Sequence, residues 1–83
     1  MYQVQISNRA TKVLEKLPDD SYERITQAVE ELAENPRPAG YKKLKGRQGY
    51  RIRVGDYRVV YEIEDDRLLV LIIDIGHRRE IYR

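Results

Sequence analysis

Residues 49–61 read Gly-Tyr-Arg-Ile-Arg-Val-Gly-Asp-Tyr-Arg-Val-Val-Tyr, two short runs rich in β-branched and aromatic residues on either side of Gly55-Asp56. Glycine at the first central position is what a two-residue type II′ turn requires, so the stretch predicts a β-hairpin. Such a turn pairs Val54 with Tyr57 and, at the far end of the hairpin, Tyr50 with Tyr61. The rest of the fold is predicted to be organised around this hairpin.

The two faces of the hairpin differ in chemistry, because side chains alternate between the faces of a strand. One face is apolar and holds Tyr50, Ile52, Val54, Tyr57, Val59 and Tyr61. The other, called here the arginine face, holds Arg51, Arg53 and Arg58, with Arg53 directly opposite Arg58, and is expected to look outward. Like charges across a strand pair are destabilising, so we expect an anionic ligand there. The alternatives are neutralisation by Glu62 or guanidinium groups that spread into water, where salt screens their repulsion over roughly 8 Å.

Composition narrows the class of protein. With 36% charged and 41% hydrophobic residues, the 83-residue chain is predicted to form one small globular domain over residues 1–83 rather than a disordered segment. It has no long apolar run and no signal-peptide pattern at its start, so we expect a cytoplasmic protein without membrane contact. There is no cysteine and only one histidine, His77, so we expect no disulfide, no metal and no cofactor.

Positive charge is concentrated in one stretch of the chain. Between residues 42 and 58 a single acidic residue, Asp56, is set against seven basic ones: Lys42, Lys43, Lys45, Arg47, Arg51, Arg53 and Arg58. A local basic surface suits a polyanion such as nucleic acid. The plainer interpretation is a solvated charged face.

The first half of the chain predicts a strand followed by two helices. Residues 2–7 alternate between apolar and polar, as in a half-buried strand. Ser7 or Asn8 can cap a helix that Pro18 ends, with a buried stripe of Ala10, Val13, Leu14 and Leu17. Asp20 and Glu23 resemble a capping box for a second helix that Asn35-Pro36 ends, with a stripe of Tyr22, Ile25, Val29, Leu32 and Ala33.

The second half predicts an antiparallel sheet. Residues 39–48 form a basic connector with a short extended piece near residues 43–45, and Asp65-Asp66 marks a turn before an apolar strand over residues 68–75. Pairing across that turn places Arg58 near Ile73, so the segment from Gly76 emerges beside the arginine face. The predicted fold is α+β: an N-terminal strand, a helical hairpin and a three-stranded antiparallel meander in one sheet.

Two motifs together resemble a known family. The stretch from Tyr50 to Tyr61, followed by Ile75-Gly-His-Arg-Arg-Glu-Ile-Tyr, is similar to the RelE/ParE superfamily of toxins from toxin-antitoxin pairs. The resemblance covers essentially the whole chain and implies a RelE-like fold similar to small microbial ribonucleases. For the RelE branch it implies a ribosome-dependent endoribonuclease that cuts mRNA without a metal. For the ParE branch it implies a DNA gyrase inhibitor that is not a nuclease.

The resemblance also implies catalytic residues. The family's basic pair on the second strand falls on Arg51 and Arg53, and its strand-three arginine falls on Arg58. The arginine after the Gly-His step falls on Arg78, and the C-terminal tyrosine falls on Tyr82. This chain departs from better-known members in the shorter interval between Arg78 and Tyr82 and in the lack of a further helix after Arg83.

Metal-free RNA cleavage by the 2′-hydroxyl needs proton transfer as well as charge stabilisation. Arginine suits the second role, because its planar fork of donors matches phosphate oxygens, but it stays protonated and is a poor base. The resemblance favours Tyr82 as the base, whereas intrinsic pKa makes His77 a competitor for acid or base. The alternatives are an exposed turn position for His77 and simple packing for Tyr82.

The basic connector is the predicted RNA-binding segment. Lys42, Lys43, Lys45 and Arg47 would contact mRNA or rRNA phosphates, and Tyr41 would stack on a base. The resemblance implies three partners: a cognate antitoxin, the ribosome with its mRNA, and operator DNA reached only through the antitoxin. The alternatives to a nuclease are a gyrase inhibitor and a non-catalytic module that binds antitoxin or nucleic acid.

Overall fold

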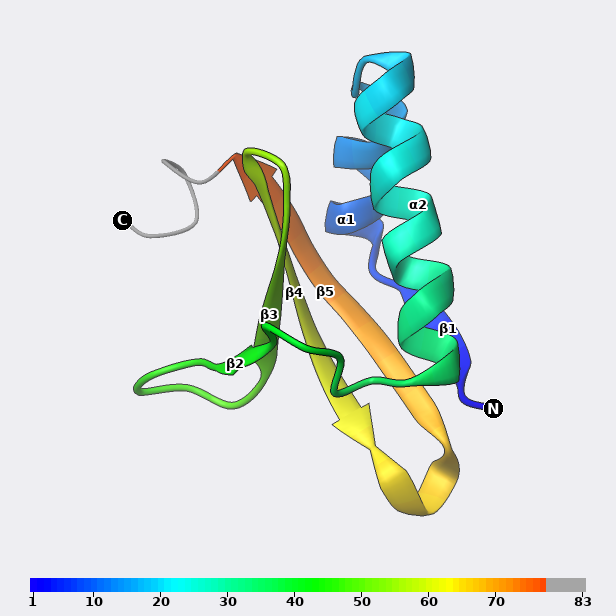
Figure 1. Ribbon diagram of the computed structural model, residues 1–83, viewed down its shortest axis with the longest axis vertical. Helices are drawn as coiled ribbons and strands as arrows, with labels where there is room; N and C mark the ends of the chain where they lie inside the picture. The colour runs from blue at the N-terminus through cyan, green and yellow to red at the C-terminus, as the bar shows by residue number, and fades with distance from the viewer. Residues whose placement is uncertain (78–83) are drawn as a thin grey trace.

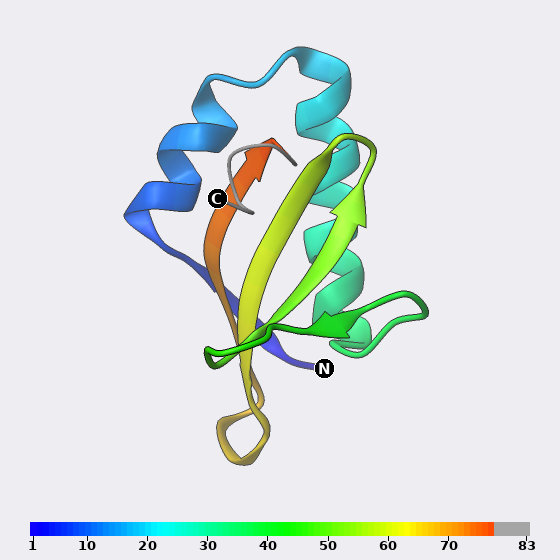
Figure 2. The ribbon, with the colours of Figure 1, turned by 90° about the vertical axis from the view of Figure 1, so that its left-hand side faces the viewer.

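Two helices cover one face of a single β-sheet (Figure 1). The structure is a computed structural model, and it describes residues 1–77. The elements in chain order are β1 (Gln3–Ile6), α1 (Asn8–Glu15), α2 (Asp19–Glu34), β2 (Lys42–Lys43), β3 (Tyr50–Val54), β4 (Tyr57–Glu64), a 3₁₀ turn η1 (Asp65–Arg67) and β5 (Leu69–His77). Figure 2 looks onto the sheet face that the helices leave open.

The sheet has the strand order β1-β5-β4-β3-β2. β5 is antiparallel to β4 and parallel to β1, so the first and last strands of the described chain lie side by side. The predicted α+β class is confirmed. The strand count differs, because the short extended piece expected near residues 43–45 lies at Lys42–Lys43 and pairs with β3 as a fifth strand.

The register of the central hairpin is as predicted. β3 and β4 pair from Val54↔Tyr57 to Tyr50↔Tyr61, and Gly55 has φ of +59°, which the turn requires of its first central residue. The apolar face packs on the helices, where Val59 and Tyr61 are fully buried among core residues of α1, α2 and β5.

The helices are close to the prediction, with two differences. Ser7 caps α1, since its hydroxyl accepts a hydrogen bond from the Ala10 amide at 3.0 Å. The capping box of α2 is wrong: the helix starts earlier, after Pro18, and no side chain caps it. Tyr22, expected in the buried stripe, is 46% exposed. The buried stripe of α2 is narrower and consists of Ile25, Val29 and Leu32.

The register between β4 and β5 differs from the prediction. Arg58 pairs with Gly76 rather than with Ile73, a difference of three residues. Two residues of this shift come from the turn, which η1 and Leu68 fill. Glu64 therefore pairs with Leu69 rather than with Arg67. The third comes from a β-bulge at Val60/Tyr61. Leu68 has φ of +49°, an unusual value for a leucine that permits this four-residue turn.

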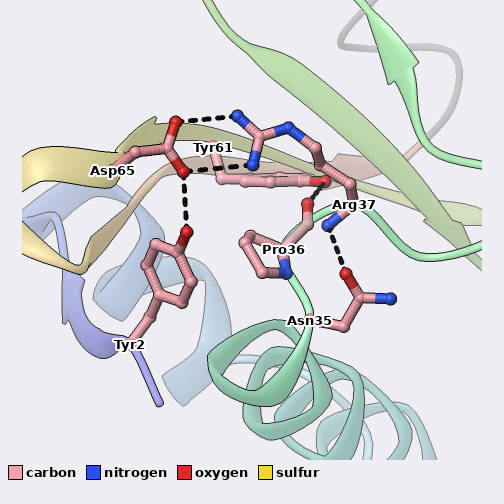
Figure 3. Close-up of polar contacts among 6 residues, drawn as sticks. All are labelled: Tyr2, Asn35, Pro36, Arg37, Tyr61 and Asp65. Atoms are coloured by element: carbon pink, nitrogen blue, oxygen red, sulfur yellow. Dashed lines mark hydrogen bonds and ion pairs between the residues drawn. The ribbon is translucent and has the colours of Figure 1, made fainter.

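A cluster of polar contacts, the Asp65 clasp, joins three distant segments (Figure 3). Asp65 accepts a hydrogen bond from the Tyr2 hydroxyl at 2.6 Å and two from the Arg37 guanidinium at 2.9 and 3.1 Å. The Arg37 bonds, with a smaller contribution from Tyr2, lower the pKa of Asp65 to about 2. Beside the clasp, the buried Tyr61 hydroxyl donates to the Pro36 carbonyl at 2.7 Å. The clasp thus fixes β1 and the end of α2 to the β4–β5 turn.

The clasp predicts a pH-dependent contribution to stability. Because folding lowers the pKa of Asp65, its contribution should be complete above pH 4 and disappear as the pH falls toward 2. We therefore expect Asp65→Asn to be less stable than wild type in urea denaturation at pH 6, with a gap that narrows between pH 4 and pH 2.5. Asp66→Asn, next to the clasp, is the matched control, and an unchanged gap over this range would contradict the assignment.

Candidate nucleic-acid interface

The arginine face lies on the side of the sheet away from the helices. Arg51 and Arg53 project from β3 and Arg58 from β4, and Arg53 pairs directly with Arg58 as predicted. Lys42 on β2 pairs with Arg51 and so shares its face. Four cationic side chains from three neighbouring strands therefore lie on one face.

Exposure is uneven across this face. Arg53 is exposed, Arg51 is half-buried and Arg58 is only 3% exposed. The expectation that all three arginines look outward is thus wrong for Arg58. Arg58 projects from β4, the middle strand of the sheet, and Val60, two residues along the same strand, is equally buried. The accessible guanidinium groups are those on β3.

A pocket of about 290 Å³ opens beside the accessible arginines. It is lined by Ala39, Gly40, Lys42, Arg51, Ile52 and Arg53. The connector before β2 supplies one wall and β3 the other, so Lys42, Arg51 and Arg53 all border a single hollow. This arrangement can bind an anion such as a phosphate group.

His77 does not share the arginine face. It pairs with Tyr57, whose side chain belongs to the apolar face, and the two rings meet edge to face with centroids 5.7 Å apart. The β-bulge at Val60/Tyr61 places His77 on this side, because a one-residue shift in register moves every later side chain of a strand to the other face. Without it, His77 would lie on the side of Arg58, as the sequence-based register implied.

The residues of the basic connector also lie on different sides of the sheet. Tyr41 packs against the core and its ring lies 5.7 Å from that of Tyr50, so it stands on the helix side and not beside the arginines. Lys43 pairs with Tyr50 and shares that side. Lys45 and Arg47 are exposed in the loop between β2 and β3. The expected site residues Arg78 and Tyr82 lie outside the described residues.

The pocket wall and the Asp65 clasp are not predictable from the sequence. Ala39 and Gly40 carry no chemical signal, and only the fold brings them to the same pocket as Arg51. Within residues 1–77 no group of three or more His, Cys, Asp or Glu side chains is placed to hold a metal ion. Neither of the two described helices is long and apolar enough to cross a membrane.

The fold and the face together define a class: a small α+β domain that presents clustered arginines on an open sheet. Comparisons with known proteins identify similar proteins among the toxins of toxin-antitoxin systems. The family described as "ParE toxin of type II toxin-antitoxin system, parDE" matches residues 4–82. The Methanocaldococcus jannaschii "Putative toxin RelE1" is 33% identical, over 99% of this chain and 96% of that protein. The Escherichia coli "mRNA interferase toxin RelE" is 30% identical, over 98% and 90%.

Solved structures are similar over the same extent. The toxin chain in the archaeal RelE-RelB complex from Pyrococcus horikoshii superimposes with a TM-score of 0.84 at 30% identity, covering 95% of this chain and 97% of that one. The corresponding chain of the intact E. coli RelBE toxin-antitoxin complex gives 0.80 at 31% identity, covering 93% and 96%. The chain belongs to the RelE/ParE toxin superfamily, and it is a RelE-like toxin of a toxin-antitoxin system.

The arginine face should reduce stability. Replacing Arg53 by threonine removes the like-charge pair with Arg58 and adds a residue favoured in strands, so we expect a gain of about 0.2–1 kcal/mol at low salt. The gain should shrink as added salt screens the repulsion. Urea denaturation at two salt concentrations measures it, with Arg47→Thr in the loop as the control. A loss of stability in Arg53→Thr would show that Arg53 is held by favourable contacts.

Proposed function

We propose that this protein is a ribosome-dependent mRNA endonuclease. The observation that carries the proposal is the gathering of Lys42 and the arginine face on one open side of the sheet, beside a pocket of phosphate-binding character. An energetically unfavourable pair such as Arg53 and Arg58 is understandable where a polyanion is the ligand, because its phosphates relieve the repulsion. The similarity to relatives named mRNA interferase supports the same function.

The chemistry assigned to the arginines is electrostatic. In the proposed reaction the 2′-hydroxyl attacks the adjacent phosphorus, the bond to the 5′-oxygen of the next nucleotide breaks, and a cyclic phosphate and a free 5′-hydroxyl are formed. Negative charge grows on the non-bridging oxygens during the attack. Arg51 and Arg53 would donate hydrogen bonds to those oxygens, with Arg58 behind them as a fixed positive charge.

Proton transfer is assigned to the segment after β5. Tyr82 is proposed as the base and Arg78 as a further phosphate ligand, both through the family resemblance. A neighbouring group of guanidinium ions favours the phenolate form of a tyrosine and so lowers its pKa. His77 is a weaker candidate than its intrinsic pKa suggests, because it lies on the other side of the sheet against Tyr57.

We further propose three partners. A cognate antitoxin is supported by the similarity to toxins solved with RelB, and operator DNA would be reached only through that antitoxin. The ribosome and its mRNA would be contacted through rRNA and mRNA phosphates by the basic loop that carries Lys45 and Arg47.

A gyrase inhibitor is the second candidate function, because the matching family is that of ParE toxins.

Removal of one accessible guanidinium tests the nuclease. Arg51→Ala and Arg53→Ala should each lower the cleavage rate by about 10²–10³ if the arginine stabilises the transition state. The measurement is primer extension on a cellular mRNA after induction, with growth followed in parallel and folding checked by circular dichroism. Arg67→Ala, whose side chain pairs with Glu64 at the far turn, is the matched control.

Two results would distinguish the candidates. Ribosome-dependent cuts that vanish in both variants and persist in Arg67→Ala support the nuclease. Growth arrest with intact mRNA, unchanged in both variants, would overturn it and direct the search to gyrase supercoiling. Arg58→Ala is informative only where its far-ultraviolet spectrum matches wild type, because Arg58 is buried.

The basic loop should contribute affinity and not chemistry. The double variant Lys45→Ala/Arg47→Ala should bind a non-cleavable 2′-deoxy-substituted oligonucleotide more weakly, with the salt dependence reduced by about 0.7 per lost phosphate contact. Cut positions should not change. Fluorescence anisotropy at several salt concentrations measures the slope. Lys12→Ala/Lys16→Ala, in α1 and at its C-cap, removes the same charge elsewhere, and an equal loss in that control would mean that net charge alone governs binding.

A further inference from the structure

The connector between α2 and β2, residues 35–41, is fixed at its start by two side chains from β4 and the turn that follows it (Figure 3). The buried Tyr61 hydroxyl donates a hydrogen bond to the Pro36 carbonyl at 2.7 Å. One residue further on, the Arg37 guanidinium binds Asp65 through two hydrogen bonds of 2.9 and 3.1 Å. These two contacts are called here the connector anchors.

The end of the connector is fixed as well. The Tyr41 ring lies with its centroid 5.7 Å from that of Tyr50 on β3, and the chain then continues directly into β2, which pairs with β3. The Tyr41 amide donates to the Pro38 carbonyl at 3.1 Å, so the chain turns sharply between these two residues. Residues 38–40 are therefore a short turn between two fixed ends.

This turn forms one wall of the pocket beside the accessible arginines. Ala39 and Gly40 border the hollow that three cationic side chains also line: Lys42, Arg51 and Arg53. Ala39 and Gly40 are both exposed, and a Cβ added at Gly40 would meet nothing within 4 Å. Because burial does not hold the turn in place, the position of this wall depends on the fixed ends of the connector.

The Tyr61 hydroxyl is an anchor that core packing does not explain. The Tyr61 ring is fully buried in the core, where a phenylalanine ring would fill the same space. The hydroxyl adds a polar group that must be hydrogen-bonded, since an unsatisfied buried hydroxyl is costly. Burial raises the pKa of Tyr61 to about 12, so the hydroxyl remains a donor at physiological pH. Its acceptor belongs to the connector, which indicates a role in holding this segment.

We propose that Tyr61 and Asp65 are positioning residues for substrate binding, which hold the connector so that its turn stays in place as the second wall of the phosphate pocket. This inference rests on the proposed nuclease function and concerns the same site. Both residues act through the connector, since the described lining of the pocket includes neither side chain. A phosphate group then meets a wall that is already ordered, so ordering the turn costs free energy on folding and not on binding.

The expected effect of losing an anchor is on affinity and not on chemistry. A wall released from its anchors reaches the binding position for only part of the time, and apparent affinity falls in proportion to that fraction. If the fraction is about one tenth, Kd and KM rise about tenfold while kcat stays within about twofold of wild type. Arg51→Ala and Arg53→Ala should instead lower kcat, because they remove donors to the transition state.

Tyr61→Phe removes the first anchor and keeps the ring. We expect an increase of about tenfold in KM for ribosome-bound mRNA, measured by primer-extension time courses. The Kd for a non-cleavable 2′-deoxy-substituted oligonucleotide, measured by fluorescence anisotropy, should rise equally. Asp65→Asn removes the second anchor at the surface and should raise the same two constants, so it decides the proposal if Tyr61→Phe does not fold.

Two controls separate positioning from stability. Val29→Ala removes buried volume from α2 and so lowers stability, but it leaves both connector anchors in place. Asp66→Asn removes a charge next to the second anchor. Both controls should keep the KM and Kd of wild type at a temperature where every variant is folded.

Amide hydrogen exchange tests the wall independently of cleavage. The Tyr41 amide should exchange faster in Tyr61→Phe than in wild type, and by a larger factor than in Val29→Ala. Unchanged KM and Kd in Tyr61→Phe, or equal increases in Tyr61→Phe and Val29→Ala, would overturn the proposal. A fall in kcat with unchanged KM would also overturn it. If wild type does not cleave mRNA, the proposed function fails, while the oligonucleotide Kd and the exchange of Tyr41 still decide the positioning role.

Discussion

The register of the β3–β4 hairpin is the constraint on which the rest of the structure depends. Gly55 adopts a positive φ in the two-residue turn, and this fixes which side chain of β3 faces which side chain of β4. From that register follow both the burial of Val59 and Tyr61 under the helices and the gathering of arginines on the opposite side. A shift of one residue would exchange the two faces and destroy the core and the basic surface together.

Prediction from sequence was accurate where a turn determines geometry locally. The Gly55 turn, the Ser7 cap and the apolar face of the hairpin depend on residues close in the chain, and all three were predictable. The bulge at Val60/Tyr61 was not, because the sequence there reads as an unbroken strand. The bulge gives β5 one extra residue, Ile73, and this extra residue decides the side of the sheet on which His77 lies. The Asp65 clasp was equally hidden, since it joins residues 2, 37 and 65.

Charge is distributed unevenly over the molecule. The β2–β3 region concentrates lysine and arginine, whereas Glu30 and Glu34 on α2 are exposed beside an apolar hollow between β1 and α2. The like-charge pair of Arg53 and Arg58 lies at the centre of the arginine face, where cross-strand repulsion is expected to lower stability.

The parallel pairing of β1 with β5 has a consequence for folding. Gln3 pairs with Leu69, and the Ser7 hydroxyl donates to the carbonyl of Ile73, 66 residues away, so closing this part of the sheet requires a long loop to be ordered first. The β3–β4 hairpin closes through neighbouring residues and should form earlier. β1 is then among the last elements to dock. A protein that recognises β1 in its place on the sheet would bind only completely folded toxin and ignore partly folded chains.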